Sequence, residues 1–357
     1  MPWQVNQVLV KQESMHKEVR ALEKWFKKVQ RPLPWRMTSD PYKIWVSEVM
    51  LQQTQVVTVI PYYEKFLEAF PTLHALADAK EETVLRHWSG LGYYSRARNL
   101  QKGAQYLVEN FAGQFPKTRA EILKVPGIGP YTAGAILSIA FDLKEPLVDG
   151  NVVRVFCRFF GIQKPVTEKS VVESLWKYAL DWVQASESPR VFNQALMELG
   201  ATVCTKASPQ CTICPIQENC IARQKDLTAV IPMPKVRKQT EDLYWIPMIH
   251  QKGNEFFLVQ NPKGEWWESM WDFPKQEFES LAAVKKTLSA FKAKSKDLTF
   301  LNAQKHTVTH HRIHVYPVLT KSPLKSEIRS GEFFHKSKIK TLPMSSLAKK
   351  ILNEFTD

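Results

Sequence analysis

The chain has 357 residues, 44% of them hydrophobic, which gives room for two domains and argues against a disordered or fibrous protein. Lys and Arg outnumber Asp and Glu by 28 to 22 in residues 1–230 and by 21 to 13 in residues 231–357. Positive charge in both parts suits a polyanion bound across both, although a merely basic soluble protein would share it.

The N-terminus lacks the continuous apolar core of a signal peptide. No window approaches the roughly 20 apolar residues that span a bilayer. We therefore expect an intracellular, cytoplasmic protein that does not engage a membrane. Cys157, within VVRVFCRFF, is expected to be a buried structural cysteine.

Residues 14–223 carry a helical pattern, in which apolar residues recur at spacings of three and four. Asp40 followed by Pro41 predicts a helix N-cap with proline at the first helical position. Strand-like alternation is absent from this part of the chain. The pattern predicts an all-α domain over 14–223.

Glu48 lies within the segment IWVSEVMLQQTQV, with Ile44 and Trp45 one turn before it and Leu51 one turn after it. A carboxylate among such neighbours holds its proton more tightly than usual, which describes a candidate general acid. Taken alone, the residue is better explained as a glutamate at the edge of a surface helix.

Two glycines, Gly127 and Gly129, precede a helix predicted to begin near Pro130 in VPGIGPYTAGAI. Glycine permits a sharp turn and lets a phosphate approach the exposed N–H groups, although any helix–helix turn can contain such a pair. Further along, Asp149 precedes Gly150 and a helix that starts at about Asn151. As an isolated residue Asp149 is most simply an N-cap.

Four of the five cysteines, Cys204, Cys211, Cys214 and Cys220, stand in one short loop with the spacing C-x6-C-x2-C-x5-C. Four thiolates this close can surround a single metal centre. Disulfides do not suit an intracellular protein. Zinc is the alternative, but zinc sites more often use two paired half-sites, so this spacing favours a [4Fe–4S] cluster.

Residues 224–243 are polar, proline-containing and aperiodic, which predicts a linker. Beyond it, short runs of β-branched and aromatic residues alternate with two helical segments, 281–294 and 343–355. TVTHHRIHVYPVL (307–319) is among the runs expected to form strands. The sequence thus predicts a small α+β domain over 244–357.

The order of these motifs resembles the endonuclease III superfamily of helix-hairpin-helix DNA glycosylases, over residues 30–220 or so. Bifunctional members of that superfamily carry a lysine just after the hairpin glycines, where this chain has Tyr131, which cannot form an imine. The chain is therefore similar to the monofunctional MutY-type adenine DNA glycosylases. LPWR (33–36), EVMLQQTQV and the C-terminal domain agree with that resemblance.

The resemblance implies a protein that removes adenine opposite 8-oxoguanine or guanine in double-stranded DNA, and that holds a [4Fe–4S] cluster. It implies that Glu48 protonates adenine at N7, that Asp149 stabilises the sugar cation, and that Tyr131 and Asn151 position the carboxylates and water. The target adenine must be flipped out of the duplex. The implied DNA contacts are Arg36, Gln53, Leu91, Tyr93, Gly127 and Gly129, although Tyr93 could instead be a core aromatic residue.

The second domain resembles the Nudix-like module that recognises 8-oxoguanine, through GEWWESMWDFP (264–274). No glutamate-rich Nudix box is present, so pyrophosphohydrolase activity is not expected. The family's lesion-reading loop usually runs Phe-Ser-His, and here the resemblance places Val308, Thr309 and His310. Four histidines cluster in this region, but along a single strand they would fall on both faces, which disfavours a metal site.

Two rival functions remain open. One is a non-catalytic DNA-binding protein, which Glu48 and Asp149 disfavour because neither helps to bind a polyanion. The other is a thymine-mismatch glycosylase of the same superfamily, which would usually lack the second domain. A monomer is expected, associated with the nucleoid if the source is bacterial.

Overall fold

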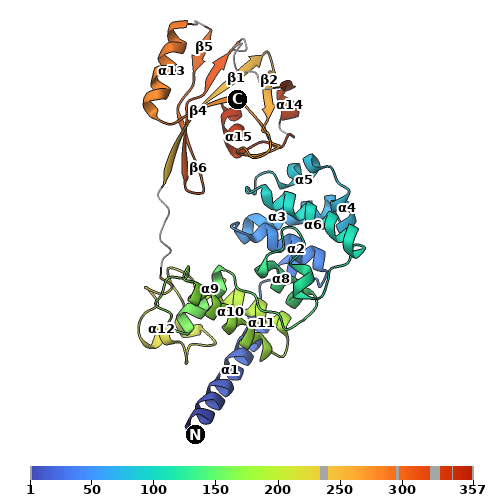
Figure 1. The fold of residues 1–357 in the computed structure, drawn as a ribbon, viewed down its shortest axis with the longest axis vertical. Coiled ribbons are helices and arrows are strands. Elements are labelled where there is room, and N and C mark those ends of the chain that lie inside the picture. Colours follow the sequence, from blue (N-terminus) through green and yellow to red (C-terminus); the bar gives the residue numbers. More distant parts are fainter. Residues whose placement is uncertain (1, 234–239, 295–296, 322–329, 340, 356–357) are drawn as a thin grey trace. The chain divides into compact units, whose positions relative to one another are not determined.

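The structure, a computed structural model, describes residues 2–233, 240–294, 297–321, 330–339 and 341–355 (Figure 1). Residues 234–239 of the predicted linker lie outside the described residues. Within the described part, no helix combines the length and the apolar character needed to cross a membrane.

The chain forms two compact units, Met1–His87 with Ser95–Val236, and Trp88–Tyr94 with Arg237–Asp357. The first is helical and the second is built around a mixed sheet, which confirms the predicted fold class. Each unit has a hydrophobic core of its own.

The helical unit begins with a long helix that starts before residue 14, where the sequence placed the domain boundary. Its α-helices are α1 (Pro2–Val29), α2 (Pro41–Leu51), α3 (Val56–Ala69), α4 (Leu73–Ala77), α5 (Glu81–Trp88), α6 (Ser95–Phe111), α7 (Arg119–Ile122), α8 (Pro130–Ala135), α9 (Gly150–Phe159), α10 (Lys169–Gln184), α11 (Pro189–Thr202) and α12 (Ile221–Gln224). Three short turns of other helical types are η1 (Pro34–Arg36), η2 (Ile136–Ala140) and η3 (Cys211–Ile213).

Side-chain caps fix where these helices start. Asp40 accepts a hydrogen bond from the Tyr42 N–H at 2.9 Å, and Pro41 occupies the first position of α2, as predicted. The predicted helix start at Pro130 is also confirmed, with Gly129 at the N-cap.

In Figure 1 the helices α2–α6 and α8 gather in one group, and α1 with α9–α12 gather in another. The core of the second group contains Leu22, Phe156, Leu175, Trp182 and Phe192. The π-type turn η2 continues α8 and contacts both α2 and α11, so it joins the two groups.

The second unit has β1 at the centre of its sheet, which pairs in parallel with β7 and β8 and antiparallel with β2 and β4. The strands are β1 (Glu241–Lys252), β2 (Glu255–Gln260), β3 (Trp271–Asp272), β4 (Lys275–Phe278), β5 (Leu298–Phe300), β6 (Gln304–Val308), β7 (His311–Val315), β8 (Val318–Thr320) and β9 (Gly331–His335). The helices are α13 (Leu281–Lys294), α14 (Lys336–Ile339) and α15 (Ser346–Leu352), followed by the short turn η4 (Asn353–Phe355).

Alternation along β1 gives the sheet two buried faces. Trp245 belongs to a core with residues of α15, whereas the next residue, Ile246, packs with Val284 of α13. The two predicted helical segments are thus both present, and they contact different clusters of the sheet.

Two details of the predicted second domain were wrong. Strand β1 begins at Glu241, inside the segment given to the linker. The run 307–319 is not one strand, because β6 ends at Val308 and β7 begins at His311. Thr309 has a φ of 55°, a left-handed conformation that interrupts the strand and turns the chain.

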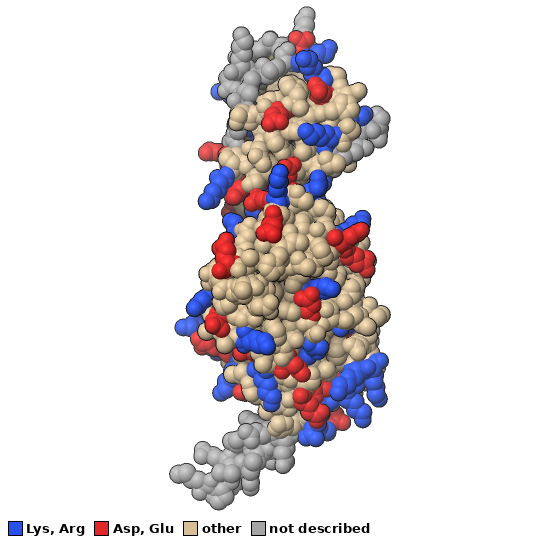
Figure 2. Space-filling model, turned by 90° about the vertical axis from the view of Figure 1, so that its right-hand side faces the viewer, with Lys and Arg blue, Asp and Glu red and all other residues tan. Residues whose placement is uncertain are grey.

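The face shown in Figure 2 carries Lys and Arg side chains interspersed with Asp and Glu. On this face the positive excess therefore does not form one continuous basic field.

Candidate active site

A cavity of about 590 Å³ lies where the two helix groups meet, within the range of about 300–1,000 Å³ that is usual for ligand sites. Apolar side chains of the wall are Leu33, Trp35, Ile44, Leu51, Val56, Ile139, Val148 and Met197. The predicted site residues that line the same cavity are Arg36, Glu48, Gln53, Tyr131, Asp149 and Asn151.

Glu48 enters the cavity from α2 and is only 5% exposed. Burial raises the pKa of its carboxyl from 4.5 to about 7, and the nearby charge of Asp149 acts in the same direction. A hydrogen bond from Tyr131 and the charge of Arg36 partly oppose this rise in pKa. Glu48 can therefore hold a proton near neutral pH and release it within the cavity.

Tyr131, the second residue of α8, donates its hydroxyl to Glu48 Oε2 and also lies 3.5 Å from the sulfur of Met197. Burial and the two nearby carboxylates raise the pKa of the phenol well above 10. The phenol remains a neutral hydrogen-bond donor, so it fixes the orientation of the Glu48 carboxyl.

Asp149 is the N-cap of α9, as predicted, and its two oxygens have separate partners. Oδ1 accepts from the Val152 N–H at 2.7 Å, and Oδ2 accepts from the Asn151 amide at 2.9 Å. Burial raises the pKa of Asp149, and these hydrogen bonds act against the rise. These hydrogen bonds stabilise the ionised form of Asp149. The cavity therefore holds one carboxyl group, Glu48, that can keep its proton near neutral pH, and a second, Asp149, that has hydrogen-bond donors for its negative charge.

A chain of hydrogen bonds continues from Asn151 into the cysteine loop. Arg154 donates to the Asn151 side-chain oxygen at 2.8 Å, to the Gly200 carbonyl at 2.6 Å and to the Cys204 carbonyl at 2.7 Å. The loop is therefore connected to Asp149 by two side chains.

The four cysteines of the loop, Cys204, Cys211, Cys214 and Cys220, line one cavity and are not in disulfides. The hydrogen-bond donors around these cysteines can stabilise thiolates. Arg158 donates to the Cys204 sulfur at 3.4 Å. Burial raises the pKa of Cys214 and Cys220, and backbone N–H groups of Ile216 and of Ala222 and Arg223 act against that rise. Four converging thiols with N–H donors fit an iron–sulfur cluster.

Sequence reasoning missed a buried ion pair in the wall of the cavity. Glu198 of α11 accepts two hydrogen bonds from Arg31 and one from Arg36, each at 2.7 Å. Burial alone would raise its pKa, but these two guanidinium groups lower the pKa of Glu198 to about 2. Arg36, predicted as a DNA contact, has a side chain only 9% exposed and faces Glu198.

The two hairpin glycines differ in their surroundings. Gly127 has a φ of 81°, and a Cβ there would stand 3.0–3.2 Å from Asn99, so glycine is required. At Gly129 a Cβ would meet nothing within 4 Å, so the backbone beside the start of α8 is open to an approaching group.

Leu91 and Tyr93 lie in the segment Trp88–Tyr94, which clusters with the second unit, and neither is among the described residues that line the cavity. Leu91 is buried, whereas Tyr93 is exposed with a φ of 48°. Gln53, which has a φ of 58°, does line the cavity. The remaining predicted residues, Thr309 and His310, form the turn between β6 and β7.

The chain is 38% identical to an adenine DNA glycosylase of Buchnera aphidicola subsp. Baizongia pistaciae over 293 residues, which cover 81% of each protein. The chain belongs to the adenine DNA glycosylase family. An adenine DNA glycosylase of Rattus norvegicus is 50% identical over 216 residues, covering 58% of this chain and 42% of the rat protein.

Both units of the chain match a family model. Residues 46–179 match the HhH-GPD superfamily base excision DNA repair proteins, and residues 245–354 match the NUDIX domain. Among solved structures, a thermostable thymine-DNA glycosylase aligns with a TM-score of 0.54 at 28% identity, covering 60% of this chain and 98% of that one. The chain is thus a DNA glycosylase with an endonuclease III-like helical domain and a Nudix-like C-terminal domain.

Proposed function

We propose that this chain hydrolyses the N-glycosidic bond of adenine mispaired with 8-oxoguanine or guanine in double-stranded DNA. The observation that carries the proposal is the pair of buried carboxyl groups, Glu48 and Asp149, which have different hydrogen-bond partners in one cavity. Two carboxyl groups with different environments divide the roles of acid and charge stabiliser in glycoside cleavage.

In the proposed reaction, the flipped adenine occupies the cavity and Glu48 donates its proton to N7. The bond between N9 and C1′ then breaks, and its electron pair leaves with the neutral base. Asp149 stabilises the positive charge on the sugar. Water adds its oxygen to C1′ and gives one proton back to a carboxylate, which leaves an abasic site.

Glu198 stabilises the wall of the cavity. Its carboxylate accepts hydrogen bonds from Arg31 and Arg36, and its side chain is only 2% exposed. The choice of adenine over thymine as the substrate base therefore rests on the similarity to an adenine DNA glycosylase over 81% of the chain.

Because Tyr131 replaces the lysine that would attack the sugar, we propose a monofunctional enzyme. Borohydride should trap little protein–DNA adduct, and the strand should break only after alkali. Tyr131→Lys supplies an amine in the same place and should add lyase activity. Strand cleavage by the unaltered protein as fast as base release would contradict a monofunctional enzyme.

We propose that Cys204, Cys211, Cys214 and Cys220 hold a [4Fe–4S] cluster. When bound, it supplies four iron–thiolate bonds that fix the loop. The purified protein should be yellow-brown and contain about four iron and four sulfide per chain. A colourless protein that carries one zinc, and loses it on Cys211→Ser, would overturn the cluster.

The decisive test uses duplexes with A opposite 8-oxoguanine, A opposite G, T opposite G and C opposite G, each treated with alkali after incubation. We expect cleavage at adenine in the first two and none in the others. The matched control is Glu48→Gln, which should bind the same duplexes without cleavage. Release of thymine, or of no base at all, would reject the proposed substrate.

A further inference from the structure

Three potential metal ligands meet beside the turn between β6 and β7. Among the described residues, Glu241, His310 and His311 form a group whose ligand atoms all lie within 4.8 Å of one another. Glu241 opposes His311 in the parallel pairing of β1 with β7, and its N–H donates to the His310 carbonyl at 3.0 Å. The backbone therefore holds the three side chains in register.

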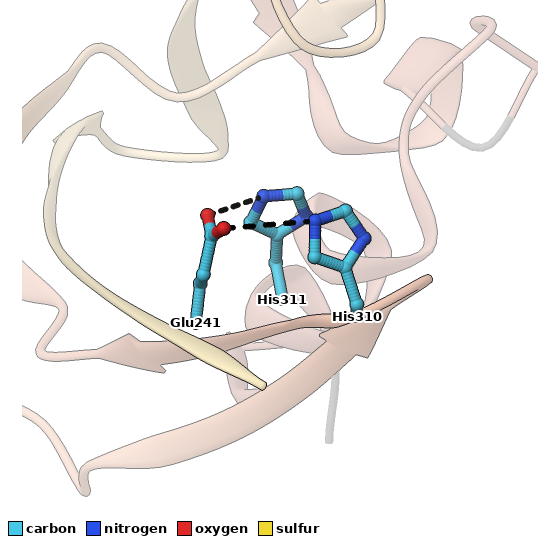
Figure 3. A group of neighbouring side chains, drawn as sticks. All are labelled: Glu241, His310 and His311. Carbon is cyan, nitrogen blue, oxygen red and sulfur yellow. Dashed lines mark ion pairs between the residues drawn. The ribbon is translucent and has the colours of Figure 1, made fainter. Parts of the chain in front are cut away.

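Both imidazole rings present the same nitrogen to the carboxylate (Figure 3). His311 Nε2 lies 3.2 Å from one Glu241 oxygen, and His310 Nε2 lies 3.9 Å from the other. Neighbouring ligand atoms around a tetrahedral Zn²⁺ with bonds of about 2.0–2.1 Å stand about 3.3 Å apart. The first separation already matches that spacing, and the second, at 3.9 Å, exceeds it.

Thr309 orients both rings from the other side. Its hydroxyl oxygen lies 3.4 Å from Nδ1 of His310 and 3.4 Å from Nδ1 of His311. A hydroxyl that accepts from Nδ1–H selects the tautomer whose Nε2 has a free electron pair, as is common for metal-binding histidines. Thr309 is β-branched in a left-handed conformation, a costly arrangement that keeps this hydroxyl between the rings.

The two imidazole rings lie close enough to bind one ion together. The ring centroids of His310 and His311 are 4.0 Å apart. Trp266 packs edge-on against His311 at 5.0 Å, which restricts that ring's motion. A single divalent cation would bind both nitrogens and neutralise the carboxylate at once.

We propose that Glu241, His310 and His311 bind a divalent transition-metal ion of the Zn²⁺ type, with one coordination position left open. Two histidines and one carboxylate are a common three-residue donor set for such ions. A bound ion would also withdraw His310 from the lesion. This second consequence rests on the proposed activity on adenine opposite 8-oxoguanine and on the lesion-reading role that the family resemblance implies for Thr309 and His310.

The test titrates Zn²⁺ into the full-length, cluster-loaded protein by calorimetry while iron content and cluster absorbance are followed. One Zn²⁺ should bind per chain without loss of iron. Glu241→Gln and His311→Gln should each weaken binding about tenfold or more. His314→Gln is the matched control. Like His311, His314 lies on β7, and it contacts a carboxylate, Asp242, at 2.6 Å, but it is not one of the three proposed ligands. Its affinity should stay within about twofold.

Absence of Zn²⁺ binding, or equal binding by wild type and Glu241→Gln, would overturn the site. Zn²⁺ uptake matched by iron loss in every variant would also overturn it, because the metal would then occupy the cysteine loop. In the excision assay, Zn²⁺ should lower the preference for A opposite 8-oxoguanine over A opposite G in wild type but not in Glu241→Gln. A zinc-free wild type without any such preference would refute the proposed lesion reading and leave calorimetry to decide the metal site.

Discussion

The two carboxyl groups in the cavity differ because their surroundings differ. Burial is the largest influence on Glu48, and with one hydrogen bond from a neutral phenol its pKa rises to about 7. Burial also raises the pKa of Asp149, but a backbone N–H and a side-chain amide act against that rise and stabilise its charge. A general acid for neutral pH needs the first environment, and a partner for a developing cation needs the second.

The rate of adenine release should therefore depend on the protonated form of Glu48. As pH rises through about 7, the single-turnover rate should begin to fall, approaching about tenfold per pH unit. Below pH 7, Glu48→Gln should lose roughly 10²–10⁴-fold in rate, because the amide has no acid proton to give. Above pH 7 this difference should narrow, because wild type loses the same proton. A loss under tenfold below pH 7, or a rate that rises above pH 7, would remove Glu48 from this role.

The same pKa predicts an effect on stability. The folded state holds the Glu48 proton up to about pH 7, whereas the unfolded chain loses it near 4.5, so stability falls as pH rises through this window. The full cost above pH 7 is roughly 3 kcal/mol. Glu48→Gln removes it, so the thermal midpoint of the variant minus that of wild type should grow from pH 5 to pH 8. Midpoints by circular dichroism at one scan rate would test this, and a pH-independent difference would contradict it.

Sequence patterns could identify some residues of the site and not others. Glu48, Tyr131 and Asp149 lie in short motifs whose residues mark them out. Glu198 could not be found in this way, since its partners Arg31 and Arg36 are 167 and 162 residues away in the chain and only folding joins them. The residues around Glu198 on α11 show only the pattern of an amphipathic helix, which predicts no ion pair.

At the scale of elements, Asp149 combines two tasks that a pair of substitutions can separate. It caps α9 through the Val152 N–H, and it presents a carboxylate to the cavity. Asp149→Asn keeps a good cap, whereas Asp149→Ala loses one, at about 1 kcal/mol. Both should lose excision by about 10²-fold or more, but only the alanine variant should melt earlier. Retained activity in Asp149→Asn would show that charge at this position is dispensable.

Local signals also explain which elements were predictable. Helix starts such as that of α2 have caps and prolines that act within one turn, and these were placed correctly. The β6–β7 turn has no glycine or proline, and its left-handed residue is a threonine, so no local signal in the sequence marks this turn. The proximity of His310, His311 and Glu241 follows from that turn and from the parallel pairing of β1 with β7, which link distant parts of the chain.

At the scale of the whole molecule, each unit carries its own chemistry. The helical unit holds the cavity with Glu48 and Asp149, and the second unit holds Thr309 and His310 on a sheet with a separate core. Base removal and lesion preference should therefore respond to different substitutions. Composition and motif order were enough to predict two domains, but not the strand that starts within the predicted linker.

The double variant Thr309→Ala with His310→Ala should keep adenine excision from A opposite G and lose much of the preference for A opposite 8-oxoguanine. The lesion differs from guanine by an N7–H donor and a C8 oxygen, and a hydroxyl can accept from that N–H. Two ordinary hydrogen bonds are worth about 1–3 kcal/mol together, so the ratio of the two excision rates should fall by roughly 5-fold to 160-fold. The assay should contain a chelator, so that metal at His310 does not contribute.

Thr307→Ala with His335→Ala is the matched control, because it removes the same two residue types from exposed positions outside the turn. A chain ending after residue 235 should show the same loss of preference and still release adenine. If the double variant kept full preference while that shortened chain lost it, the lesion would be read elsewhere in the second unit.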